Sequence, residues 1–101
     1  MNLNQEKWLS SINNSENSLI IDVRTQDEFK DGHIENSLNF NIYDAVKFIE
    51  EISKLDKQAS VHVYCKSGVR SLQACEIIKG MGFSKVFNLI GGITEWKNKI
   101  V

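Results

Sequence analysis

The sequence predicts an α/β fold in which helices cover both faces of one mainly parallel sheet of about four to five strands. Two observations lead to this prediction. Short apolar segments rich in β-branched residues alternate along the chain with segments whose apolar residues recur at helical spacing. The 101 residues, 42% of them hydrophobic, suffice for one globular domain and are too few for two, so we expect a single domain over residues 1–101.

Helix and strand alternate through the first half of the chain. A helix with Trp8 and Ile12 on one face comes first, and an apolar run typical of a strand buried on both faces follows. Thr25 and Glu28 have the spacing of a capping box, which predicts the start of a short helix. A weaker strand and a helix with one charged face come next. In order, these elements cover residues 5–12, 19–23, 26–31, 37–41 and 43–55, and the apolar side of the last consists of Val46, Ile49, Ile52 and Leu55.

The same alternation continues in the second half. Residues 60–64 form another buried apolar run, and residues 69–81 form a helix that Gly82 can end as a C-cap. A strand over residues 85–90, a Gly-Gly turn and a final helix over residues 93–99 follow. Because helices join consecutive strands, the strands should run parallel, and ligands of such sheets gather at the carboxyl ends of the strands.

Charge and composition exclude several classes of function. The net charge of −1 offers no basic surface for nucleic acid, and no apolar run is long enough to span a bilayer. The first residues lack the pattern of a signal peptide, so we expect a cytoplasmic protein with reduced thiols. Two cysteines without a CxxC pair or a Cys/His cluster predict neither a disulfide framework nor a metal site. A monomer is the expected state of such a compact domain.

Cys65 is the strongest candidate for a functional residue, because it leaves the carboxyl end of a predicted strand and precedes a predicted helix. A helix N-terminus and nearby cations lower the pKa of a thiol, and Lys66 and Arg70 are such cations. Gly68 permits a backbone conformation that other residues avoid, so the N–H groups of the loop can form a concave anion site. The expected cradle, which suits a persulfide anion on the sulfur, consists of Lys66, Ser67, Gly68, Val69 and Arg70.

Three separated stretches together resemble the rhodanese family: DVRTQDEFKDGHI at residues 22–34, CKSGVRS at residues 65–71, and the stretch from GMGF to GGITEW at residues 80–96. The resemblance covers residues 16–98 and implies a small single-domain enzyme of the thiosulfate sulfurtransferase type. It implies that Cys65 takes a sulfane sulfur from thiosulfate, a persulfide or a polysulfide and passes it to a thiol or cyanide. It also implies that no cofactor is needed and that the partners are small sulfur donors, thiol acceptors or a protein persulfide.

The other motif residues are expected to bind substrate or to support the fold. Lys66 and Arg70 are candidates for contacting an anionic donor, and Arg70 can instead pair with an acidic neighbour. Arg24 and Glu28 have the spacing of an ion pair, and Asp22 can also hold Arg24. The residues expected to have a supporting structural role are Asp22, Arg24, Glu28 and His33.

Other functions fit parts of the pattern. Phosphatases and arsenate reductases of this fold attack from a Cys-x5-Arg loop, and the Cys-x4-Arg spacing of Cys65 and Arg70 favours sulfur over phosphate. The presence of Cys65 disfavours a non-catalytic binding module. A carrier that delivers its persulfide to a partner protein uses the same chemistry and remains an alternative. Cys75 lies along the helix after the loop and is expected to be a small core residue rather than a redox partner of Cys65.

Overall fold

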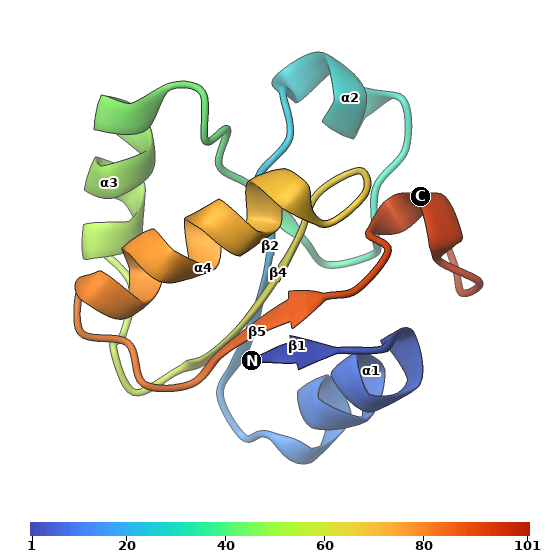
Figure 1. Ribbon diagram of the computed structural model, residues 1–101, viewed down its shortest axis with the longest axis horizontal. Helices are drawn as coiled ribbons and strands as arrows, with labels where there is room; N and C mark the ends of the chain where they lie inside the picture. Colours follow the sequence, from blue (N-terminus) through green and yellow to red (C-terminus); the bar gives the residue numbers. More distant parts are fainter.

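The computed structural model describes residues 1–101 and has a five-stranded sheet at its centre (Figure 1). The strands are β1 (Asn2–Leu3), β2 (Ser18–Asp22), β3 (Leu38–Asn39), β4 (Ser60–Tyr64) and β5 (Val86–Leu89). Their order across the sheet is β1-β5-β4-β2-β3, and every neighbouring pair runs parallel. The predicted α/β fold with a parallel sheet is therefore confirmed.

Helices provide most of the connections between the strands. They are α1 (Gln5–Asn14), α2 (Gln26–Lys30), α3 (Ala45–Ser53), α4 (Val69–Gly80) and the 3₁₀ helix η1 (Ile93–Glu95). The predicted capping box is present at the start of α2, where the Thr25 hydroxyl accepts from the Glu28 N–H and the Glu28 carboxylate accepts from the Thr25 N–H. None of the helices combines the length and the apolar character that crossing a membrane requires.

The side chains of the central strand β4 alternate between two hydrophobic clusters. Val61 and Val63 lie in the larger cluster with buried residues of α3 and α4, and Cys65 continues this alternation into the same cluster. Tyr64 points the other way and lies in the smaller cluster with Trp8 of α1. Helices α3 and α4 therefore cover one face of the sheet and α1 covers the other (Figure 1).

The candidate site lies at the carboxyl edge of this sheet. Asp22 of β2 is paired with Tyr64 of β4, so the residues that follow both strands emerge next to each other. Helix α2, the loop that leads into α4 and the segment after β5 gather at this end of the molecule (Figure 1). Three connections that are distant in sequence are thus available to build one site.

The two ends of the chain differ from the prediction. Strand β1 was not predicted, because two residues are too few to show a periodicity; the edge of β5 holds it through the pairing of Asn2 with Asn88. The helix predicted over residues 93–99 is reduced to η1, because the backbone is extended at Trp96. The Trp96 ring packs edge-on against Trp8 at a centroid distance of 5.5 Å, which directs the chain away from a helical path.

The buried side of α3 also differs from the prediction. Phe48 and Ile52 are buried, whereas Val46 and Ile49, which were expected on the apolar side, are 73% and 47% exposed. The helix carries two apolar stripes, and the one that contains the larger Phe48 side chain faces the sheet. The prediction is right for Ile52, which is buried, and for Leu55, which packs against the core. It is wrong for Val46 and Ile49, because spacing alone does not say which of two stripes is buried.

Candidate active site

Cys65 directly follows β4, and its sulfur lies against the loop that turns into α4. The residue is only 1% exposed. The Gly68 N–H donates to Sγ at 3.0 Å, and the Ser71 Oγ lies 3.3 Å from it. Gly68 occupies the N-cap position of α4 with φ +107°, a left-handed conformation that favours glycine, and no side chain caps this helix. The sulfur therefore takes the place of a capping oxygen at a helix N-terminus.

Because of these hydrogen bonds, the two thiols of the protein differ in pKa. Burial raises the pKa of Cys65, but hydrogen bonds from the Ser71 side chain and from the N–H groups of Ser71, Gly68 and Ser67 outweigh burial and lower the pKa overall. Cys75 is also buried, at 2% exposure, but burial dominates there and raises its pKa to about 11. Of the two sulfurs, Cys65 is therefore the one that loses its proton more readily.

The segment after β5 forms hydrogen bonds to the backbone of the Cys65 loop. The Ile93 N–H donates to the Cys65 carbonyl at 3.0 Å, and the Thr94 N–H and Oγ1 donate to the Lys66 carbonyl at 3.0 and 2.8 Å. Gly92 passes so close that a Cβ built on it would lie 2.4 Å from the Lys66 oxygen. Because both carbonyls are tied to this segment, the N–H groups that follow them are free to face the sulfur.

Arg70 is engaged in an ion pair with Glu28. Its Nη1 and Nη2 donate to the two carboxylate oxygens of Glu28 at 2.7 and 2.9 Å, and its guanidinium stacks over the Tyr43 ring at 5.5 Å. This bond lowers the pKa of Glu28 to about 2, so the carboxylate is ionised at neutral pH. Of the two alternatives for Arg70, the structure shows the pairing with an acidic neighbour. The predicted Arg24–Glu28 pair is wrong, because Glu28 is occupied by Arg70.

Arg24 pairs instead with Asp22, and both are buried beneath the loop after β2. Their closest atoms, Arg24 Nη2 and Asp22 Oδ2, are 2.6 Å apart, and the same Nη2 donates to the Gly32 carbonyl at 2.7 Å. Their place within the fold fits the predicted supporting role. His33 is also tied locally, since its Nδ1 lies 2.9 Å from the Phe29 carbonyl and its ring stacks on that of Phe29.

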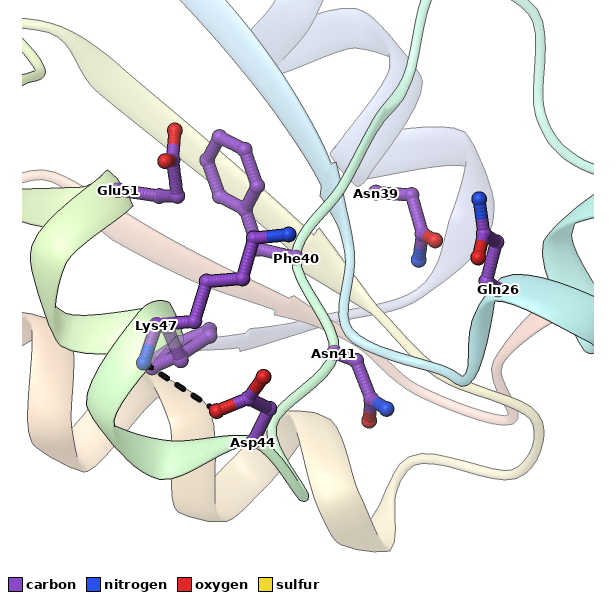
Figure 2. A pocket seen from close by; sticks show the side chains of 8 residues that line it. Gln26, Asn39, Phe40, Asn41, Asp44, Lys47 and Glu51 are labelled. Carbon is purple, nitrogen blue, oxygen red and sulfur yellow. Dashed lines mark hydrogen bonds between the residues drawn. The ribbon is translucent and has the colours of Figure 1, made fainter.

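A separate polar hollow lies beside α3 at the β3 edge of the sheet (Figure 2). Its lining includes amide and charged side chains from α2, the segment after β3, and α3, namely Gln26, Asn39, Asn41, Asp44, Lys47 and Glu51. Cys65 and the residues of its loop do not line it. The structure also brings together no group of three or more His, Cys, Asp or Glu side chains that could hold a metal ion.

Several residues of the site were not singled out from the sequence. Ser71 belongs to the quoted motif, and its position in the first turn of α4 is the signal that could have placed its hydroxyl near the sulfur. Gly92 and Thr94 belong to the quoted stretch at residues 80–96, but nothing in that stretch points to the Cys65 loop, and Tyr43 belongs to no quoted motif. They reach the loop only through tertiary contacts, across sequence separations that no local pattern describes.

We expect Lys66→Glu to slow the alkylation of Cys65 near neutral pH by about two- to tenfold, because an anion replaces an exposed cation next to the thiolate. The lowered pKa of Cys65 predicts that the alkylation rate rises with pH and reaches half of its plateau below the ordinary thiol pKa. Lys66→Glu should move this midpoint to higher pH. Iodoacetamide rates across a pH series, in a Cys75→Ser background, measure both effects.

Lys85→Glu is the matched control for this experiment. It makes the same change of charge, but Lys85 lies just before β5, at the amino ends of the strands, whereas Cys65 lies at their carboxyl ends. It should leave the rate and the midpoint nearly unchanged, and added salt should shrink the effect of Lys66→Glu. Equal rates for the two variants would show that hydrogen bonds alone activate the thiol.

Comparisons with known proteins agree with this architecture. A family model described as rhodanese-like domain matches residues 5–99. Thiosulfate sulfurtransferase GlpE of Coxiella burnetii is 38% identical over 79 residues, which are 78% of this chain and 71% of that protein. A sulfurtransferase of Allochromatium vinosum is 32% identical over 94 residues, covering 93% of this chain and 85% of that protein. The crystal structure of a rhodanese-related protein from Thermoplasma volcanium matches with a TM-score of 0.82 at 25% identity, covering 99% and 96% of the two chains.

Proposed function

This chain belongs to the rhodanese-like domain family, and from that membership and the geometry of the loop we propose that it transfers a sulfane sulfur through a persulfide on Cys65. The donor is thiosulfate, a persulfide or a polysulfide, and the acceptor is a thiol or cyanide. The observation that carries the proposal is the hydrogen bonding at the buried Sγ, which accepts from the Gly68 N–H and lies within hydrogen-bond distance of the Ser71 hydroxyl, a group that can donate to it once the sulfur is ionised.

The reaction consists of two displacements at sulfur. In the first, the Cys65 thiolate attacks the outer sulfur of the donor, and the rest of the donor leaves with the electron pair of the broken S–S bond, as sulfite or as a thiolate. In the second, the acceptor attacks the outer sulfur of the persulfide, and Cys65 leaves as a thiolate. The same N–H and hydroxyl groups stabilise the persulfide anion and the departing thiolate, because the charge stays at one end of the loop.

The position of Arg70 disfavours phosphoryl transfer as the rival function. A phosphatase loop of this kind needs a guanidinium that clamps the oxygens of the phosphate. Here both terminal nitrogens of Arg70 are bonded to Glu28. We therefore expect no turnover of an aryl phosphate. A carrier that delivers the Cys65 persulfide to a partner protein differs from the proposed enzyme only in its acceptor.

Mass spectrometry of the intact protein tests this proposal. After exposure to a sulfane-sulfur donor, the mass should rise by about 32 Da, the mass of one sulfur atom, and peptide mapping should place the gain on Cys65. Addition of cyanide or a thiol should then remove the gain and release thiocyanate or a new persulfide. Absence of the adduct with thiosulfate, polysulfide and glutathione persulfide alike would overturn the proposal.

A further inference from the structure

The loop around Cys65 has one cation that is not engaged in an ion pair. Arg70 is neutralised by Glu28, and its side chain is only 18% exposed. The ion pairs of the protein are Arg24–Asp22, Lys54–Glu51, Arg70–Glu28 and Lys99–Glu35. Lys66 belongs to none of them and is exposed. An anion that approaches the sulfur therefore meets a single available positive side chain from the loop.

Apolar side chains are unusually exposed on the same part of the molecule. Val69, the first residue of α4, is 75% exposed, and Leu72 in the same turn of the helix is 47% exposed. Tyr43, whose ring lies beneath the Arg70 guanidinium, is 70% exposed. The surroundings of the loop thus offer carbon surface to a ligand, in addition to the charge of Lys66.

The two classes of donor differ in the charge that they bring to the thiolate. Thiosulfate is a small dianion, so the thiolate must approach two further negative charges, and the products are the persulfide anion and sulfite. An organic persulfide reacts in its protonated form, R–S–SH, which brings no negative charge on the two reacting sulfurs; any charge of the group R lies further from them. The thiolate bonds to its outer sulfur, the proton stays on that sulfur, and R–S⁻ leaves with the electron pair of the broken bond. The first reaction needs more positive charge at the site than the second.

We propose that Glu28 determines the donor class: by withholding Arg70 from the site, it makes organic persulfides the preferred donors and thiosulfate a poor one. This inference rests on the proposed sulfur transfer and specifies its substrate. The organic group R has the exposed side chains of Val69, Leu72 and Tyr43 available for contact, whereas Lys66 is the only cation of the loop that is free to pair with the sulfonate of thiosulfate. Glu28 acts through Arg70 and is a specificity-determining residue rather than a catalytic one.

The ratio of kcat/KM for glutathione persulfide to kcat/KM for thiosulfate tests the proposal. In the unmodified protein we expect the ratio to favour the persulfide by about tenfold or more, the effect of one missing charge-assisted hydrogen bond. Glu28→Gln should lower the ratio by about tenfold, mainly through faster use of thiosulfate, because it frees a guanidinium already close to the site. The glutamine can still accept the Thr25 N–H, so the cap of α2 is retained.

Asp27→Asn is the matched control, because it makes the same change of charge on the same helix at an exposed residue that forms no ion pair. It should leave the ratio unchanged. The double variant Glu28→Gln/Arg70→Gln should lose the gain in thiosulfate use, since the gain is assigned to the freed Arg70. A gain that persists without Arg70, or an equal ratio in Glu28→Gln and Asp27→Asn, would contradict the role of Glu28.

The unmodified protein alone tests the predicted donor preference, even where a variant does not fold. Faster use of thiosulfate than of glutathione persulfide overturns the inference while leaving sulfur transfer intact. Absence of a Cys65 adduct with every donor overturns sulfur transfer itself. A persulfidated cysteine peptide of larger size forms a further arm: a higher kcat/KM than for glutathione persulfide identifies protein cysteines as the source of the persulfide, and a lower one identifies small thiols.

Discussion

Replacement of Cys65 by serine is expected to abolish both the sulfur adduct and turnover, with a loss in kcat/KM of about a thousandfold or more. The hydroxyl of serine is a far weaker nucleophile than a thiolate, and the Gly68 N–H and the Ser71 hydroxyl beside it cannot ionise it at neutral pH. Intact mass after donor treatment and steady-state thiocyanate formation measure the two effects. An adduct that survives in Cys65→Ser would place the reactive sulfur elsewhere.

Cys75→Ser is the control that isolates this effect. The Cys75 thiol is buried among the apolar residues between α4 and the sheet, and its pKa is raised to about 11, so little thiolate forms at neutral pH. The adduct and its rate of formation should be unchanged in Cys75→Ser. A lower adduct yield in a folded Cys75→Ser protein would indicate that the second thiol takes part in the transfer.

Gly92→Ala is expected to cause the second largest loss, at least about tenfold in kcat/KM together with about 1–3 kcal/mol of stability. The added Cβ would lie 2.4 Å from the Lys66 oxygen and 2.6 Å from the Cys65 oxygen, and these are backbone atoms that cannot move aside independently. The φ of +59° with ψ of −160° adds strain for any L side chain. The loop must shift, and the N–H groups at the sulfur shift with it.

Gly80→Ala is the matched control for this substitution. Gly80 closes α4, and a Cβ added there meets no atom within 4 Å, so this variant should be as stable as the unmodified protein or slightly more so. Thermal unfolding measures the stability of both variants, and the pH dependence of Cys65 alkylation measures the loop geometry. Gly92→Ala with an unchanged alkylation midpoint would show that the close packing of residue 92 does not position the loop.

The sheet and the position of Cys65 between a strand and a helix start could be predicted from the sequence because their signals are local. The β-branched run before Cys65, the glycine three residues later and the helical spacing after it lie in one short stretch, and together they predict a strand, a turn and a helix start. The capping box of Thr25 and Glu28 is equally local, and the structure shows it.

The arrangement around the nucleophile could not be predicted in the same way, because it depends on which distant segments meet. The spacing predicted Arg24, four residues before Glu28, as its partner, and it could not name the acidic neighbour of Arg70. Arg70 lies beyond the next two strands, and only the tertiary fold brings it to Glu28. Which side of α3 faces water could not be predicted for a similar reason. Two apolar stripes compete for burial, and the one with Phe48 is buried while Val46 is exposed. Short-range periodicity predicts whether a segment is a helix or a strand, but it does not predict which other segments pack against it.

The hydrogen bonds between the Cys65 loop and the segment after β5 have a consequence for when, during synthesis and folding, the loop takes its final geometry. The Lys66 carbonyl is held by Thr94, 28 residues further along the chain, so during synthesis on the ribosome Cys65 emerges well before its brace does. Until β5 pairs with β4 and Gly92 packs against the loop, the N–H groups that lower the Cys65 pKa have no fixed direction. The loop that holds the Cys65 thiol therefore reaches its final geometry only after residues 92–94 have been synthesised and have packed against it.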